Sequence, residues 1–434
     1  MTLPKALPLR GGHHGSKQSY CFCQQVRGMA GDTLDIDLAS QAFMRDPFPT
    51  LSRLREAGPV VRVKLPFLGK TWVATTHEAV SAVLKDDSTF VRSPKNAGKN
   101  QFAGMRWWMP RTLRVLAENM LGYDDPDHRR LRKLVDQAFN RQSVEGLRGR
   151  IGGLCDGLLD RLAGAGPVDL MEGLARPLPL AVIGELLGLP EEDRPEFRRW
   201  VQALMSVTSL WGAVRFLPGL FRLVGYFKRH FAQCRRQPRP GLMTALVQAE
   251  QDGDKLSENE LLAMAFLLLV AGHETTVHLI GGGVRALLEA PEQKARLLAD
   301  WSLAPSAVEE LLRFVSPVQV SKPRYVRREL EFHGRMLRRG DILIPMLASA
   351  NADPGRFDSP ERMDLSRAPN PHVAFGTGMH FCLGAQLARV EAQVVLEKLF
   401  TRFPNLSLAV PGATLRYTGR LGLRALTALP VRVT

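Results

Sequence analysis

The stretch Phe375–Ala388, FGTGMHFCLGAQLA, places a single cysteine in a glycine-rich loop. The residues after Gly384 favour a helix, so Cys382 is predicted to lie just before a helix N-terminus. At that position the free N–H groups and the helix dipole favour a thiolate over a thiol. A cysteine in such a loop is weak support by itself, because most buried cysteines act only as small hydrophobic residues.

Composition is that of a soluble globular protein. The chain has 434 residues, 45% of them hydrophobic and 23% charged, which is enough for a core that encloses a cofactor. The net charge of +15 is spread over predicted helices without a nucleic-acid motif. We therefore expect no nucleic acid and favour an acidic protein partner; the alternatives are a basic soluble protein without a specific partner and an anionic membrane surface.

Five irregularly spaced cysteines do not form a disulfide framework, so a reducing cytoplasm is expected. Residues 1–28 lack acidic side chains and the apolar segment of a signal peptide, and they are predicted to be a disordered leader. Residues 29–434 are predicted to form a single domain. The apolar run 261–270 is too short for a membrane span. A soluble monomer is expected.

The periodicity of the chain predicts a mainly α fold with small β sheets. The segments PVVRVKLP (59–66) and KTWVATT (70–76) alternate like the strands of a hairpin. Most of 126–315 is helical in pattern. Short β segments return near 318–345 and 406–431. The prediction is a large helical body with small sheets formed by both ends of the sequence.

One predicted helix is unusually long. It begins at Ser257, which has Glu260 in capping-box spacing, and no proline follows until Pro291. A helix of this length spans about 50 Å and would cross a whole domain. Its apolar middle, interrupted by the polar run 272–276, indicates burial. The interruption is either a kink with a back-bonded threonine or a groove that admits a small ligand and a proton path.

Several motifs occur together and in order. Phe375, Gly378, His380, Cys382 and Gly384 match FxxGxHxCxG. The other motifs are DDPDHRRLRKLVDQAF (124–139), AGHETT (271–276), EELLR (309–313), SKPRYV (321–326) and PERMD (360–364). With these motifs the chain resembles the cytochrome P450 family in its soluble bacterial form, from about residue 37 to 433. The resemblance implies the cytochrome P450 fold, with the long central helix crossing a helical body.

The resemblance also implies a cofactor and its ligands. Haem b would be held by Cys382 as the metal ligand, because a thiolate is the electron-rich axial ligand of such haem proteins. The other residues expected at the cofactor are His128, Arg132, Ala271, Arg324, Phe375, Gly376, His380 and Gly384. Glu310 and Arg313, joined by Arg362, would form an ion-pair network that anchors the cysteine loop. Alone, the Glu310–Arg313 pair would suggest only a solvated helix face.

The implied reaction is monooxygenation. Glu274 and Thr275 would deliver protons to dioxygen, and the presence of both favours a monooxygenase over a peroxide-driven relative. One oxygen atom would enter an apolar organic substrate, by hydroxylation or epoxidation. Electrons would come from a separate ferredoxin and its reductase, docked on Arg129, Arg130 and Lys133. The alternatives are a haem-thiolate sensor without this chemistry and a helical binding protein without haem.

Substrate identity is not predicted. The residues expected to line the pocket are Trp107, Trp108, Val318, Gln319 and Leu421, with Gln319 and Arg420 as candidate polar anchors. For Trp107 and Trp108, plain packing is the alternative. Fatty acids, terpenoids, steroids and polyketide intermediates all suit such a lining.

Overall fold

A computed structural model of the chain describes residues 33–65, 69–99, 116, 119–138, 144–164, 166–205, 210–239, 241–251 and 254–433. Structural statements below concern these residues. The predicted leader, the boundary at residue 29, Trp107 and Trp108 lie outside the described ranges.

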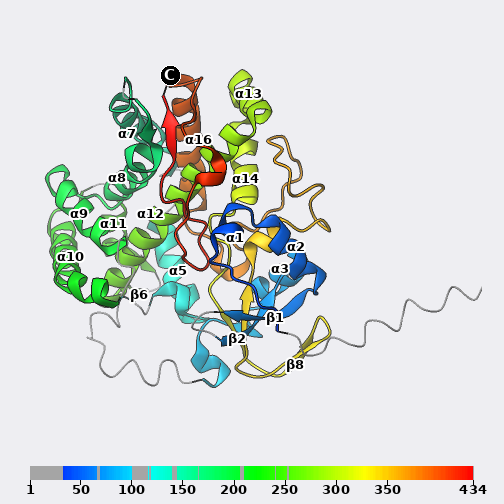
Figure 1. Cartoon of the computed structure of the whole chain (residues 1–434). Helices are drawn as coiled ribbons and strands as arrows, with labels where there is room; N and C mark the ends of the chain where they lie inside the picture. Colours follow the sequence, from blue (N-terminus) through cyan, green and yellow to red (C-terminus); the bar gives the residue numbers. More distant parts are fainter. Residues whose placement is uncertain are drawn as a thin grey trace, which may run out of the picture.

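The predicted mainly α architecture is confirmed (Figure 1). The α-helices are α1 (Gln41–Arg45), α2 (Phe48–Glu56), α3 (His77–Lys85), α5 (Asp127–Ala138), α7 (Arg148–Asp160), α8 (Pro177–Leu186), α9 (Arg194–Met205), α10 (Leu210–Arg236), α11 (Leu242–Gln248), α12 (Glu258–Glu289), α13 (Pro291–Ala299), α14 (Ala304–Val315), α15 (Leu347–Asn351) and α16 (Ala385–Arg402). A π-helical turn covers Met171–Ala175. Short 3-10 turns are Pro94–Ala97, Met120–Gly122, Glu191–Asp193, Trp301–Leu303, Gly378–His380 and Gly412–Thr414.

The β structure is confined to small sheets. Its strands are β1 (Val60–Leu65), β2 (Gly69–Ala74), β3 (Phe90–Val91), β4 (Val168–Asp169), β5 (Glu250–Gln251), β6 (Asp254–Lys255), β7 (Arg324–Val326), β8 (Leu330–Phe332), β9 (Arg335–Leu337), β10 (Ile342–Pro345), β11 (Ser407–Leu408) and β12 (Pro430–Arg432). The largest sheet has the order β1-β2-β10-β7-β3. Its antiparallel β1–β2 pair is the predicted hairpin, and β10 runs parallel to β2. A second sheet joins β11, β12 and β4.

Helix α12 is the predicted long central helix (Figure 1). Its capping box is formed: the Ser257 hydroxyl accepts from the Glu260 N–H at 3.3 Å, and the Glu260 carboxylate accepts from the Ser257 N–H at 2.9 Å. The helix packs against α8, α14 and α16. It is long and apolar enough to cross a membrane by length and composition, but 56% of its apolar window is buried inside the protein. That burial is what a core helix shows.

Candidate active site

The cysteine loop is held in one conformation by its own main chain. The Cys382 N–H donates to the Phe375 carbonyl at 3.0 Å, and the Phe381 N–H donates to the Gly378 carbonyl at 3.0 Å. Gly378 has φ +74°, and a Cβ there would lie 2.4 Å from the Leu84 carbonyl oxygen. Only glycine fits this position. Because α16 begins at Ala385, Cys382 lies just before its N-terminus, as predicted.

The surroundings of Cys382 do not make its thiol acidic. Burial raises the pKa of this thiol, while a main-chain hydrogen bond from Gly384 and the positive charges of Arg132 and Arg389 only partly offset it. The main-chain hydrogen bond at the helix N-terminus favours the thiolate, as expected, but the effect of burial on the pKa outweighs it. A coordinated metal cation would supply the missing stabilisation, because a coordinating thiol is deprotonated.

Two apolar features flank this sulfur. The Phe381 side chain, next to Cys382, is 42% exposed, which is unusual for a phenylalanine among ordered core elements. Gly376 has open space where its Cβ would stand, and so has Gly384. The loop therefore presents an apolar, uncrowded surface beside the thiol, which suits the face of a flat hydrophobic cofactor.

A cluster of basic side chains lies beside the loop. Helix α5 contributes His128 and Arg132, strand β7 begins with Arg324, and the cysteine loop contributes His380. The rings of His128 and His380 have centroids 4.2 Å apart. Burial, followed by the charge of Arg92, lowers the pKa of His380 to about 2. The sequence therefore identified four side chains that the fold does bring together.

Polar atoms in this basic cluster are buried without partners. Within the described residues, both ring nitrogens of His128, both of His380 and the Nε of Arg324 have no hydrogen-bond partner. Leaving such groups unpaired is costly, at about 1–3 kcal/mol each. Carboxylates would satisfy the donors among them. The cluster therefore fits a cofactor that carries acidic side arms, as haem does with its two propionates.

Arg92 belongs to the same cluster and was missed by sequence reasoning. It follows β3, and its guanidinium donates to the Lys322 carbonyl at 2.7 Å and to the Ser321 hydroxyl at 3.2 Å. Burial, together with the nearby positive charge of Arg324, lowers the pKa of Arg92 to about 9. An arginine in TFVRSP matches none of the motifs, so the sequence offered no signal for it.

The positive charge of Arg324, next to Arg92, is partly compensated by an acidic side chain. Arg324 forms an ion pair with Asp87 at 2.8 Å and donates to the Phe90 carbonyl at 3.1 Å. Its remaining unpaired atom is the Nε. Arg132 donates to the Phe381 carbonyl at 2.8 Å, which ties helix α5 directly to the cysteine loop.

The polar interruption of α12 does not break the helix, which is continuous through residues 271–276. Thr275 donates its hydroxyl to the Ala271 carbonyl at 2.8 Å, and Thr276 donates to the Gly272 carbonyl at 3.1 Å. The sequence left two interpretations of this polar run open, and one of them, a threonine hydrogen-bonded to the preceding turn, is therefore present. Ala271 is exposed and the residues around it are mostly half-buried, whereas residues 261–265 and 276–280 of the same helix are buried. This turn of the central helix therefore faces open space.

Glu274 points to a partner from the C-terminal part of the chain. Its carboxylate forms an ion pair with Arg420. Arg420 lies in the hairpin defined by the bridge between Tyr417 and Leu426. The adjacent Leu421 is 37% exposed. Arg420, considered as a substrate anchor, is thus already engaged with the predicted proton donor.

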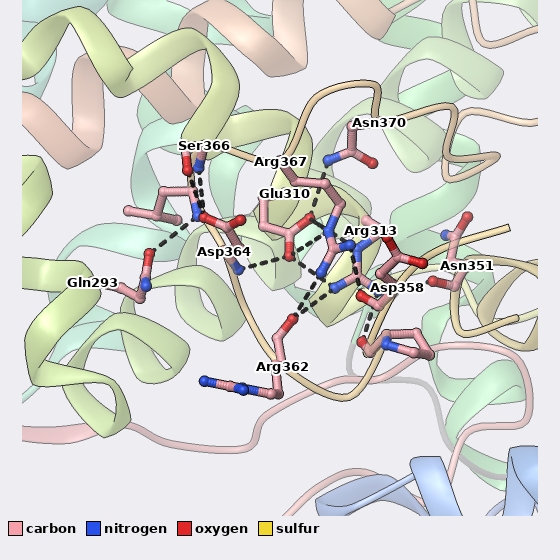
Figure 2. A network of polar contacts seen from close by, with 12 residues as sticks. Gln293, Glu310, Arg313, Asn351, Asp358, Arg362, Asp364, Ser366, Arg367 and Asn370 are labelled. Atoms are coloured by element: carbon pink, nitrogen blue, oxygen red, sulfur yellow. Dashed lines mark hydrogen bonds and ion pairs between the residues drawn. The ribbon is translucent and has the colours of Figure 1, made fainter. Parts of the chain in front are cut away.

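The Glu310–Arg313 pair is fully buried and bidentate (Figure 2). Arg313 Nε and Nη2 each donate to a Glu310 carboxylate oxygen at 2.8 Å. The same guanidinium donates to the carbonyls of Asn351 at 2.9 Å and Pro360 at 2.8 Å. The pair therefore connects α14 with the segments that lead to the cysteine loop, as predicted.

The third member of this network is Arg367, which corrects the assignment to Arg362. Arg367 Nε donates to both carboxylate oxygens of Glu310, at 3.1 and 3.3 Å (Figure 2). Arg362 contributes only its main-chain carbonyl, which accepts from Arg313 and Arg367 at 3.2 Å each. Its side chain is exposed. The turn that brings the carbonyl of Arg362 inward leaves its side chain in solvent.

One further expectation is corrected and a second is narrowed. Gln319 is 1% exposed and, with Phe314 and Ala348, lines a cavity of about 10 Å³, so its side chain faces the core and not an open pocket. Arg130 of the expected electron-donor dock is partly exposed and is paired with Glu260 and with Asp254. Sequence spacing could not show either orientation.

Other expected positions are less constrained. Val318 is half-buried and pairs with Leu423 in an isolated β-bridge. Arg129 forms an ion pair with Asp125, and Lys133 is exposed on α5. Within the described residues, no group of three or more His, Cys, Asp or Glu side chains could hold a metal ion. A metal bound at Cys382 would therefore need most of its ligands from a cofactor.

Comparisons with known proteins place this geometry in a family. The Cytochrome P450 family model matches residues 223–409. The chain is 41% identical over 93% of its length to cytochrome P450 107B1 of Saccharopolyspora erythraea, of which it covers 98%. It is 40% identical over 94% of its length to the cytochrome P450 monooxygenase PikC of Streptomyces venezuelae, of which it covers 96%.

Solved structures agree with the sequence relatives. The Bacillus subtilis polyketide synthase cytochrome P450 PksS superposes with a TM-score of 0.84 at 38% identity, over 92% of this chain and 100% of that one. The chain belongs to the cytochrome P450 family. It is a cytochrome P450 monooxygenase, and membership of this family implies a haem cofactor.

Proposed function

We propose that Cys382 is the protein ligand of haem b in a monooxygenase that inserts one atom of dioxygen into an apolar organic substrate. The observation that carries the proposal is the position of Cys382, on an uncrowded apolar loop beside a basic cluster with unpartnered buried nitrogens. When bound, haem would supply the centre that activates dioxygen. His128, Arg132, Arg324, His380 and Arg92 would hold its propionates.

Glu274 and Thr275 are proposed to move protons at the open turn of α12. A hydroxyl has one donor proton and two acceptor lone pairs. While Thr275 donates to the Ala271 carbonyl, its oxygen can still accept from a water molecule. Rotation of the same hydroxyl would let it donate into the open space. The Glu274 carboxylate one residue earlier would then be the group that replenishes the proton.

The electron donor is proposed to be a ferredoxin with its reductase. The net charge of +15 and the exposed Lys133 on α5 support an acidic partner. Arg129 and Arg130 are each ion-paired within the chain and remain at least one third exposed. We also propose that the protein works as a monomer in the cytoplasm.

The substrate class is proposed from the relatives. Their printed names include a polyketide biosynthesis cytochrome P450, a mycinamicin IV hydroxylase/epoxidase and a vitamin D(3) 25-hydroxylase. A solved neighbour is bound to tirandamycin C. These names favour a large apolar molecule of the polyketide, macrolide or steroid class. Spectral titration of such a library, with fatty acids as a comparison set, would detect the ligands that displace water from the haem.

Turnover separates the proposal from a haem-thiolate sensor. With a surrogate ferredoxin and its reductase, a monooxygenase consumes NADPH faster when substrate is added and forms an oxygenated product. A sensor binds the same ligands but forms no product. The presence of both Glu274 and Thr275 at the open turn favours the enzyme.

A further inference from the structure

A second charged cluster contacts the cysteine loop at Phe375. It joins Glu309 of α14, Arg389 of α16 and His372, ten residues before Cys382 in the chain. Arg389 Nε and Nη2 donate to the two carboxylate oxygens of Glu309 at 2.6 and 2.9 Å. The Nε2 of His372 is 3.0 Å from Glu309 Oε2. Glu309 is therefore the centre of a three-residue network that joins two helices to a loop.

The hydrogen bonds define the protonation states of His372 and Glu309. The Nδ1 of His372 accepts from the Ala374 N–H at 3.2 Å, so its Nε2 carries the proton and donates to Glu309. Burial would raise the pKa of Glu309, but the hydrogen bonds from Arg389 and His372 outweigh it and lower the pKa to about 2. Glu309 is therefore a carboxylate throughout the working pH range, and it fixes the Arg389 guanidinium from one side.

The free face of Arg389 lies over Phe375. Its guanidinium carbon is 4.6 Å from the centre of the Phe375 ring, which is cation–π geometry. The carbonyl of Phe375 accepts the Cys382 N–H at 3.0 Å. Arg389 thus reaches Cys382 through Phe375, and the same contact places its positive charge beside the cysteine loop.

We propose that Arg389, held by Glu309 and His372, is a positioning residue of the cysteine loop whose positive charge tunes the reduction potential of the haem that Cys382 binds. The inference rests on the proposed function, because it requires Cys382 to be the iron ligand. Arg389 touches neither substrate nor cofactor in this role; it acts through Phe375 and through its charge. Glu309 limits that charge, so the two side chains have opposite effects on reduction.

The test is the midpoint potential of the purified haem protein. Reduction adds one negative charge, so Arg389→Gln, which removes a positive charge, makes reduction less favourable. Glu309→Gln leaves the guanidinium uncompensated and makes reduction more favourable. We expect changes of about threefold to tenfold in the reduction equilibrium constant, in opposite directions, or about 30 to 59 mV for a one-electron couple. Arg389→Lys keeps the positive charge, so its midpoint potential is expected to stay close to that of the unaltered protein.

The matched control is Lys398→Gln. Lys398 lies on the same helix, α16, and pairs with Asp156 of α7 at 2.8 Å, so the substitution removes the same charge far from the loop. It is expected to change the reduction equilibrium constant by less than twofold. The reduced, carbonyl-bound spectrum is recorded for every variant, because it reports whether the thiolate ligand is retained.

The outcomes are distinct. Opposite shifts with the thiolate spectrum retained support the proposal. Shifts in the same direction in Arg389→Gln and Glu309→Gln, together with loss of the thiolate spectrum in both, show that the cluster only holds the loop together and overturn it. Unchanged potentials in both variants also overturn it, while leaving the proposed function intact. If the unaltered protein itself lacks the thiolate spectrum, the proposed function fails and the inference fails with it.

Discussion

Arg420 of the C-terminal hairpin forms an ion pair with Glu274 in the middle of the central helix α12. The carboxylate that is proposed to deliver protons is thereby tied to a segment almost 150 residues further along the chain. Both side chains are partly buried. The pair fixes the direction of the carboxylate beside the exposed Ala271, and it also places the exposed Leu421 next to the same open turn.

This relationship predicts unequal effects of removing its two members. Glu274→Gln removes the proton-delivering group and is expected to slow product formation about 10²-fold. Arg420→Gln leaves the carboxylate in place and is expected to slow it only a few-fold. The rates of product formation are measured at saturating substrate, with haem content as the normalisation. Equal losses in the two variants, or no loss in Glu274→Gln, would contradict the assignment of Glu274.

Thr275→Val tests the hydroxyl. It is expected to preserve haem content and substrate affinity but to divert electrons into hydrogen peroxide or water, so that less product forms per NADPH. Thr276→Val is the matched control, because Thr276 makes the same back-bond one residue later but is buried. It should keep the coupling and lose about 1 kcal/mol of stability at most. Unchanged coupling in Thr275→Val would leave this threonine a purely structural residue.

The corrected arginine network predicts a contrast in stability. Arg367 is only 12% exposed, and its loss would leave the buried Glu310 with one positive partner fewer. Arg367→Ala is therefore expected to destabilise the protein by roughly 3 kcal/mol. Arg362→Ala is expected to stay within about 0.5 kcal/mol, because its main-chain carbonyl remains. Chemical denaturation of both variants compares them directly, and a larger loss in Arg362→Ala would refute the correction.

Glu391 predicts a pH dependence of stability. This residue of α16 is buried, its Oε2 has no hydrogen-bond partner within the described residues, and burial raises its pKa to about 8. The folded protein keeps the proton that the unfolded chain loses above its ordinary pKa of 4.5. The contribution of Glu391 to the free energy of unfolding therefore falls as pH rises from 4.5 towards 8, and it stays constant above pH 8.

The variant Glu391→Gln removes this titration. Its gain in stability should grow between pH 4.5 and 8 and reach roughly 3 kcal/mol at pH 7. Glu397→Gln on the exposed face of the same helix is the control and should show no such trend. Thermal unfolding across a pH series measures both. A gain that does not depend on pH would show that Glu391 is ionised in the folded protein.

Sequence patterns predicted the parts of the protein that depend on local chemistry. The cysteine loop was identified because Phe375, Gly378, His380, Cys382 and Gly384 match one short motif, and the cap of α12 because Ser257 and Glu260 have capping-box spacing. His128 and Arg132 were found because they share one face of a single helix. In each case the determinant lies within a few residues of the side chain concerned.

Side-chain direction in irregular segments was not predictable in the same way. Arg362 and Arg367 lie five residues apart in a loop without period, and only the tertiary fold decides which guanidinium reaches Glu310. Gln319 turns into the core because its segment pairs with the C-terminal hairpin through the Gly422 carbonyl. Arg92 became a neighbour of Arg324 only through the pairing of β3 with β7. These contacts join distant parts of the chain, and no local spacing encodes them.

The central claim is that Cys382 is the ligand of the haem iron, and the reduced, carbonyl-bound absorption spectrum tests it most directly. The protein should show the long-wavelength Soret band of thiolate ligation. Cys382→Ala should lose this band, whereas Cys155→Ala and Cys234→Ala, which alter buried cysteines elsewhere in the core, should keep it. A Cys382→Ala protein that retains the thiolate band would contradict the account.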